Sequence, residues 1–173
     1  MNVMLDTGFL ITLVDASRSN HQIANDYLET INANGHNILL SPLAIAEYSV
    51  KSDPQPLFEM GMFEIPGFNL RHALKAAQFR QHTDVNHGLR DSLNTRAVII
   101  NDTQIIAQAS VEDVDYILTE DRNSFCKTAN KLREAGFTKC KVVPLSSGYK
   151  PELFTSMEQI EIRFPEEELL TQN

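Results

Sequence analysis

The stretch NDTQIIAQASVEDVDYILTEDRNSF, residues 101–125, decides the fold that we predict for this chain. Within it, DTQIIAQAS has the composition of a helix, and YILT, directly before Asp121, has that of a short strand. The run AVII ahead of Asp102 also has strand composition, although four apolar residues are equally typical of the end of a buried helix. A helix followed by a short apolar strand that ends at an aspartate is typical of α/β proteins.

Further apolar runs have the length of buried strands: NVML at 2–5, NILL at 37–40, FEI at 63–65 and KVVPL at 141–145. The first of these runs ends at Asp6. The second leads into a helix that carries Glu47. Ser41 and Pro42 suit the start of this helix, because serine caps helices and proline is tolerated in the first turn. Short apolar runs alternating with helices predict an α/β fold.

Helical patterns lie between these runs. From Ser19 to Asn34, apolar residues recur at spacings of three and four, and a glycine closes the pattern. Another helix is predicted over about 122–135, where it stops at Gly136. A third is predicted over 70–82, with these residues available for packing: Leu70, Leu74, Ala77 and Phe79.

Length and composition indicate one domain of ordinary size. The chain has 173 residues, 42% of them apolar, and no apolar run approaches the roughly 20 residues that a membrane helix requires. We take residues 1–146 as the body of the domain and 147–173 as an acidic C-terminal extension of it. The first apolar run lacks a basic segment and contains Asp6, and two cysteines are too few for a disulfide scaffold, so we expect a cytoplasmic protein.

The formal net charge of -8 is unusual for a protein that binds nucleic acid, because phosphate contacts draw on Lys and Arg. Residues 151–173 carry six glutamates against Arg163 alone, so the body is only mildly acidic. Residues 71–96 are richer in cations, and they indicate either a phosphate-facing surface or a solvated helix face. The candidate phosphate-binding residues of this segment are Arg71, Lys75, Arg80, Arg90 and Arg96.

Four acidic residues are the strongest candidates for a functional site: Asp6, Glu47, Asp102 and Asp121. Each of the three aspartates follows an apolar run and precedes a helical one, where a capping aspartate contributes about 0.5–2 kcal/mol. Glu47 has apolar residues one turn away on both sides, and a carboxylate on such a face is rarely buried without a partner. Because ligands gather at the carboxyl ends of the strands in open α/β sheets, these groups are expected at one edge.

Four converging carboxylates repel one another and raise at least one pKa, and a divalent cation removes that conflict. The candidate ligands are all oxygen, which favours Mg²⁺ or Mn²⁺ over zinc. Such an ion keeps several waters and can activate one of them against a phosphodiester, so no protein nucleophile is required. The neighbouring Thr7, Asn101 and Thr119 either orient a water or a carboxylate or serve as ordinary turn and cap residues.

The blocks MLDTGFLI, AIAEYS, NDTQIIAQA and ILTEDRNSF resemble, in order and spacing, the four motifs of the PIN-domain family, which includes the VapC-type toxins of bacterial toxin–antitoxin pairs. The resemblance covers about residues 1–145. It implies a three-layer α/β/α sandwich with a short, mainly parallel central sheet, and an endoribonuclease that depends on Mg²⁺ or Mn²⁺. The metal-binding catalytic acids that it implies are Asp6, Glu47, Asp102 and Asp121, and Thr119 supplies a supporting hydroxyl. Many members carry another acid at the place of Asn123, which favours one firmly bound metal over two.

These patterns lead to hypotheses from different classes. The leading one is a ribonuclease that cleaves RNA, with a toxin role, a small antitoxin protein and a homodimer as further expectations. The second is a non-catalytic PIN-type module that binds RNA or acts inside an assembly, motivated by the acidic net charge and by Asn123. The third, a phosphatase of the haloacid-dehalogenase type, is disfavoured because Gly8 stands where such a site requires a second aspartate.

Overall fold

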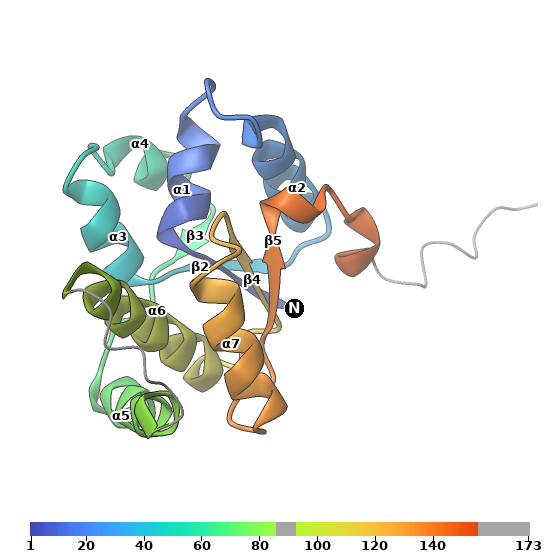
Figure 1. Ribbon diagram of the computed structural model, residues 1–173. Helices are drawn as coiled ribbons and strands as arrows, with labels where there is room; N and C mark the ends of the chain where they lie inside the picture. Colours follow the sequence, from blue (N-terminus) through green and yellow to red (C-terminus); the bar gives the residue numbers. More distant parts are fainter. Residues whose placement is uncertain (86–92, 156–173) are drawn as a thin grey trace, which may run out of the picture.

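The computed structural model describes residues 1–85 and 93–155, without the side chains of 84, 85 and 93–98 (Figure 1). Its centre is a parallel sheet with the strand order β3-β2-β1-β4-β5. The strands are β1 (Asn2–Leu5), β2 (Asn37–Leu40), β3 (Phe63–Glu64), β4 (Tyr116–Thr119) and β5 (Lys141–Pro144). The helices are α1 (Thr7–Val14), α2 (His21–Ala33), α3 (Pro42–Ser49), α4 (Gln55–Glu59), α5 (Leu70–Val85), α6 (Leu93–Val111) and α7 (Phe125–Glu134).

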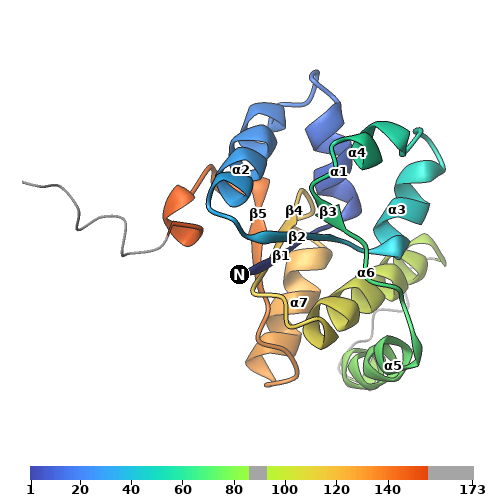
Figure 2. The same cartoon turned by 180° about the vertical axis from the view of Figure 1, so that it is seen from behind.

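Helices cover both faces of the sheet. Figures 1 and 2 show α1 and α2 on one side and α6 and α7 on the other, with α5 packed on the outside of α6. The predicted three-layer α/β/α sandwich with a short parallel sheet is therefore confirmed. No helix in the described part of the chain is both long and apolar enough to cross a membrane.

The strands are apolar on both faces because helices bury them from both sides. Val3, Met4 and Leu5 of β1 are fully buried, as are Ile117 and Leu118 of β4. Their backbones lie in register, with Leu5 opposite Leu118 on one side and Leu40 on the other. The central strands therefore end together at one edge of the sheet.

The predicted strands at 2–5, 37–40 and 141–145 are confirmed within a residue, and YILT is the whole of β4. The run AVII is different, because it belongs to the first half of α6. Its four apolar residues therefore belong to a helix, which is the alternative that the sequence left open. Asp102 consequently lies inside a helix, and the capping interpretation is wrong for it.

The prediction of α5 is confirmed, but the prediction of its packing face is largely wrong. Leu70 and Leu74 are 72% and 64% exposed, and Ala77 is exposed as well. The buried side chains of this helix are His72, Ala76, Phe79 and Thr83. Because α5 packs against α6 from the outside, the described part of the chain covers one of its faces and leaves the other uncovered.

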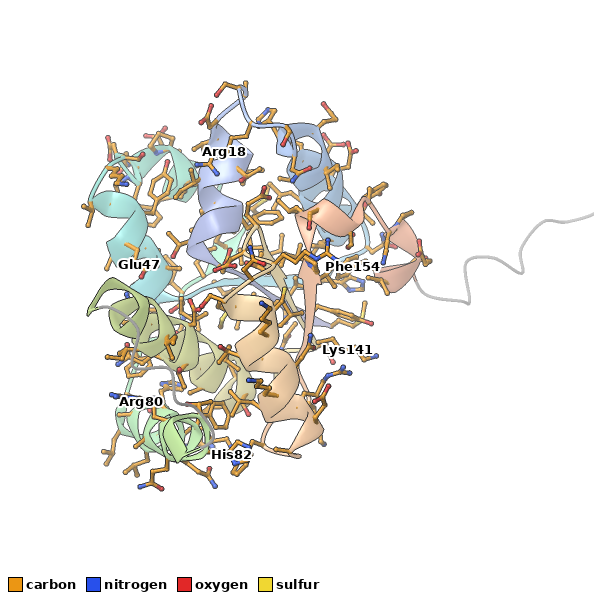
Figure 3. The ribbon with its side chains drawn as sticks, viewed as in Figure 1. Arg18, Glu47, Arg80, His82, Lys141 and Phe154 are labelled. Carbon is orange, nitrogen blue, oxygen red and sulfur yellow. The ribbon has the colours of Figure 1, made fainter. Side chains whose placement is uncertain are left out.

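The first residues of the C-terminal extension pack onto the body of the domain. The short helical turns Leu145–Ser147 and Pro151–Leu153 lead to Phe154, which is fully buried. Its ring meets the rings of Tyr27 and Tyr116 edge-on, with centroids 5.7 and 5.2 Å apart (Figure 3). The hydroxyl of Tyr27 also donates to the carbonyl of Gly148 at 2.9 Å. Residues 147–155 thus contribute to the core.

Candidate active site

Asp6 and Asp121 come together because β1 and β4 are neighbours. The backbone N–H of Asp6 donates to the carbonyl of Leu118 at 3.1 Å, directly where both strands end. From β1 the chain goes to β2 on one side, and it later returns to β4 on the other. Such a reversal of strand order opens a crevice at the carboxyl ends of the strands, where ligands bind in α/β proteins.

Asp6 is the N-cap of α1, as predicted, and it is only 5% exposed. Its Oδ1 accepts from the N–H of Phe9 at 2.8 Å, and its Oδ2 accepts from the hydroxyl of Thr119 at 2.5 Å. The pKa of Asp6 is raised to about 7, chiefly by burial and to a smaller extent by the charges of Asp102 and Asp121, in spite of these hydrogen bonds.

Thr119 links the two strand-end aspartates. Its hydroxyl donates to Asp6 and accepts from the backbone N–H of Asp121 at 2.9 Å. Asp121 in turn organises the turn before α7, because its Oδ1 accepts from the N–H groups of Asn123 and Ser124 at 2.7 and 2.8 Å. The contacts of Thr119 place its hydroxyl between two of the acids. Its supporting role in catalysis stays a prediction.

Glu47 lies on α3, half-buried, and faces α1 and α6 (Figure 3). Its Oε2 accepts from the hydroxyl of Thr7 at 2.5 Å, and its Oε1 accepts from the side-chain amide of Asn101. Thr7 directly follows Asp6, and Asn101 directly precedes Asp102. These two polar neighbours therefore tie Glu47 to the segments that carry two of the other acids.

Asp102 lies in the middle of α6 and is 9% exposed. Its Oδ2 accepts from the hydroxyl of Ser124 at 2.7 Å. The pKa of Asp102 is raised to about 7, chiefly by burial and to a smaller extent by the charges of Asp121 and Glu47, against the hydrogen bond from Ser124. The repulsion felt by Asp6 and Asp102 thus links all four acids into one electrostatic group.

Ser124 is a site residue that the sequence did not reveal. It contacts two acids at once, through its hydroxyl to Asp102 and through its backbone N–H to Asp121. Asn123 reaches Asp121 only through its backbone N–H, while its side chain is exposed. A hydroxyl three residues after an aspartate and just before a helix is the only signal for Ser124 in the sequence, and it is also the signal of an ordinary helix cap.

Gly8 allows the turn that carries Asp121 to approach α1. A Cβ at Gly8 would lie 3.1 Å from the Cβ of Glu120, which is tighter than ordinary packing. The carboxylate of Glu120 points to Asn20, whose side-chain amide donates to both oxygens at 3.0 and 3.3 Å. Glu120 therefore has its own partner, although it lies between Thr119 and Asp121 in the sequence.

The donor set of the four acids suits a hard divalent cation in its chemistry. All of the candidate ligands are carboxylate oxygens, and their mutual repulsion is of the kind that a cation relieves. In the described part of the chain, however, no three His, Cys, Asp or Glu side chains are arranged to hold an ion as they stand. The carboxylates instead accept from Thr7, Asn101, Thr119 and Ser124, and would have to turn toward one another around an ion.

The part of the predicted basic segment that lies on α5 does not adjoin these acids. Arg71 is exposed and Lys75 and Arg80 are half-buried on α5, which lies on the far side of α6 from Glu47 (Figure 3). The side chains of Arg90 and Arg96 lie outside the described residues. The structure thus separates α5 from the candidate site by a whole helix.

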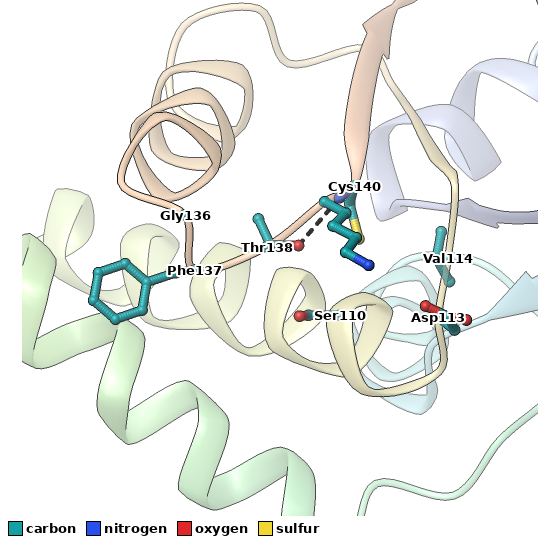
Figure 4. Close-up of a pocket in the computed structure, with 8 residues that line it drawn as sticks. Ser110, Asp113, Val114, Gly136, Phe137, Thr138 and Cys140 are labelled. Atoms are coloured by element: carbon teal, nitrogen blue, oxygen red, sulfur yellow. Dashed lines mark hydrogen bonds between the residues drawn. The ribbon is translucent and has the colours of Figure 1, made fainter.

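A cavity of about 190 Å³ lies at the other edge of the sheet, where β4 and β5 begin (Figure 4). It is lined by the end of α6 and by the loop from α7 to β5, including Asp113, Thr138 and Cys140. The backbone N–H of Cys140 donates to the hydroxyl of Thr138 there, at 3.2 Å. None of the four acids lines this cavity.

Solved structures with a similar fold include chains of two bacterial complexes, whereas no family model and no curated protein matches the sequence. One is the crystal structure of VapBC2 from Rickettsia felis bound to a DNA fragment from its promoter. Its TM-score is 0.56 at 18% identity, and the match covers 82% of this chain and 98% of that one. The other is a toxin–antitoxin complex from Klebsiella pneumoniae, with a TM-score of 0.51, 19% identity and coverage of 71% and 89%. The likeness concerns the fold, and it confirms the PIN-like architecture that the motifs predict.

Proposed function

We propose that this protein is a metal-dependent endoribonuclease whose active site consists of Asp6, Glu47, Asp102 and Asp121. The observation that carries the proposal is the group of four acids at the sheet edge, in which burial and, to a smaller extent, mutual repulsion raise the pKa of two carboxyls to about 7. A fold gains nothing from such an arrangement by itself, because unpaired buried carboxylates are destabilising. A cation bound by these acids accounts for it.

The four acids would hold Mg²⁺ or Mn²⁺, which supplies a metal-activated water and stabilises the leaving oxygen of a phosphodiester. The surrounding residues orient the carboxylates. Thr119 fixes Asp6 relative to the Asp121 turn, and Ser124 fixes Asp102 relative to the same turn. Thr7 and Asn101 hold Glu47 from both sides.

RNA as the substrate follows from the PIN-type motifs, and the fold shared with chains of toxin–antitoxin complexes supports it. The same likeness supports a toxin role with a small antitoxin protein as partner, and we extend the proposal to a homodimer. Co-expression with the product of a neighbouring small gene tests the toxin role. If induced expression of this chain alone left growth unchanged, the toxin role would be refuted, although the nuclease would not.

Cleavage of a labelled structured RNA by the purified protein tests the activity. We expect cleavage with Mg²⁺ or Mn²⁺, none with EDTA, and a loss of more than about 100-fold in Asp102→Asn, since a metal contributes several kcal/mol to such a reaction. Asp15→Asn is the matched control, because Asp15 is an exposed aspartate that pairs with Arg18 at the end of α1. Equal cleavage by both variants would contradict the assignment.

A non-catalytic RNA-binding module is the second candidate, and the hydrogen-bonded positions of the four carboxylates favour it. Each acid already has a donor, and no three of the described acids are arranged around an ion. Calorimetric titration with Mn²⁺ separates the two functions. Stoichiometric binding that Asp102→Asn abolishes supports the nuclease, whereas RNA binding without any metal binding supports the module.

A further inference from the structure

The largest concentration of positive charge in this chain lies directly after the fourth acid. Between residues 122 and 150 there are seven Lys or Arg against Glu134 alone, in a chain whose net charge is -8. All seven cations are exposed: Arg122, Lys127, Lys131, Arg133, Lys139, Lys141 and Lys150. Such a local excess in an acidic protein is the electrostatic signature of a surface that meets a polyanion.

The first part of this surface is the exposed face of α7. Phe125, Ala129 and Leu132 form the buried face of the helix. Lys127 and Lys131 are four residues apart, so they lie one turn apart on the same side. From Phe125 to Glu134 the helix is about 15 Å long, so it offers a row of cations rather than a single charge.

This row begins at the candidate active site. Arg122 directly follows Asp121, and Ser124, the residue before α7, contacts both Asp102 and Asp121. At its other end α7 packs against β5. Lys141 at the start of β5 lies outside this row, because its ammonium group lies 5.5 Å from the ring centre of Tyr116, and that ring packs with Phe154 toward α2. A chain bound along α7 would therefore reach the four acids at the start of the helix.

The α5 segment is a weaker candidate for the same role. It carries Arg71, Lys75 and Arg80, but it lies beyond α6, and its exposed face also bears Leu70 and Leu74. The ammonium group of Lys75 lies over the ring of Phe79, 5.1 Å from its centre. Charge density and position relative to the acids both favour α7.

We infer that the exposed face of α7, with Lys127 and Lys131 at its centre, binds the phosphate backbone of the RNA and leads it to the four acids. The inference rests on the proposed function for the identity of the polyanion. The lysines of α7 contribute to the affinity for RNA and to its path, and the four acids carry out the cleavage. Contacts of this kind are independent of sequence and depend strongly on salt.

The test is the affinity for a labelled single-stranded RNA, measured by fluorescence anisotropy in EDTA between 50 and 200 mM salt. The variant is Lys127→Gln/Lys131→Gln, and Arg71→Gln/Lys75→Gln on α5 is its control, with the same spacing and the same loss of charge. Each lost phosphate contact should weaken binding about 5-fold at 0.1 M salt, hence about 25-fold for the α7 pair. The slope of log K against log salt should become shallower by about 1.4.

We expect wild-type affinity for the α5 control and for Lys127→Arg/Lys131→Arg, which keeps both charges. Thermal unfolding verifies that each variant is folded. If the α7 pair bound RNA as tightly as wild type, or if the α5 pair were the one to weaken binding, the inference would be overturned.

Cleavage of the same RNA in Mn²⁺ is scored separately. If RNA binding depends on Lys127 and Lys131 but no cleavage occurs, the nuclease is refuted and the binding surface stands. If cleavage occurs but the affinity for RNA does not depend on these lysines, the binding surface alone is refuted.

Discussion

Replacing Asp102 by asparagine should stabilise the metal-free protein at pH 8, although it removes a candidate ligand. The pKa of Asp102 is raised from its ordinary value of 3.8 to about 7, first by burial and then by the charges of Asp121 and Glu47. Asparagine keeps an oxygen that can accept the hydrogen bond from Ser124, so the main change is the loss of the negative charge. Asp6 is less suitable, because each of its oxygens accepts a hydrogen bond and an amide can replace only one of them.

The raised pKa of Asp102 explains why its replacement should stabilise the protein. Folding favours the protonated acid, so the contribution of this group to stability is complete below pH 4 and is lost as the pH rises through 7. Three pKa units correspond to about 4 kcal/mol at pH 8 as an upper limit. The new amide NH₂ group needs a hydrogen-bond partner in a largely buried site. Its desolvation offsets about 1–3 kcal/mol of that gain in stability. A net gain of about 1–3 kcal/mol remains, or about 2–10 °C in Tm for a chain of this size.

Thermal and urea unfolding in EDTA at pH 5 and pH 8 measure this effect. Wild type should lose stability between the two values, and Asp102→Asn should lose less. Mg²⁺ should then stabilise wild type and have little effect on the variant. Asp15→Asn is the control of opposite sign, because hydrogen bonds from Ser17 lower the pKa of that exposed carboxyl. An Asp102→Asn protein that unfolded more easily than wild type at pH 8 in EDTA would refute the reasoning.

Other substitutions test the surroundings of the site. Thr119→Val removes the hydroxyl between Asp6 and Asp121, so it should weaken Mn²⁺ binding about 10–100-fold by calorimetry, whereas Thr119→Ser should keep it. Phe154→Ala should lower the free energy of unfolding by about 3–5 kcal/mol in urea, because the ring is fully buried. Deleting residues 156–173 keeps Phe154 and removes five glutamates against Arg163. If this tail screens the basic surfaces, the truncated protein should have unchanged stability and tighter RNA binding at 50 mM salt, and equal affinity would dispose of screening.

The strand-end acids could be predicted because a local pattern determines them. An apolar run long enough for a buried strand, followed by an aspartate and a helix, places Asp6 at the cap of α1, and the structure confirms this position. The order of the motifs also predicted the PIN-like fold. What brings Asp6 and Asp121 together is the pairing of β1 with β4, which only the motif order indicates and no local pattern specifies.

The remaining features depend on tertiary packing, which a single sequence does not specify. Apolar residues before Asp102 suit a strand and a buried helix equally, and the packing of α6 between α5 and the sheet decides for the helix. Leu70 and Leu74 are exposed because no element among residues 1–85 and 93–155 covers the outer face of α5. The cations of residues 122–150 are at least as dense along the sequence as those of residues 71–96, so the sequence does not separate the two segments. The fold distinguishes them, because α7 begins beside Asp121 and α5 lies beyond α6.

Two other partly buried acids in the described part of the chain have partners of their own. Glu112 accepts from Nε2 of the buried His72 at 2.8 Å, because the other ring nitrogen of that histidine accepts from the backbone N–H of Asn69. Asp15 pairs with Arg18. Within residues 1–83 and 99–155 none of the four acids takes part in such a pair, and their donors are hydroxyl, amide and backbone N–H groups, which carry no net charge. Neutral donors orient a carboxylate without cancelling its charge, so these contacts leave the repulsion among the four acids in place, as the proposed cation site requires.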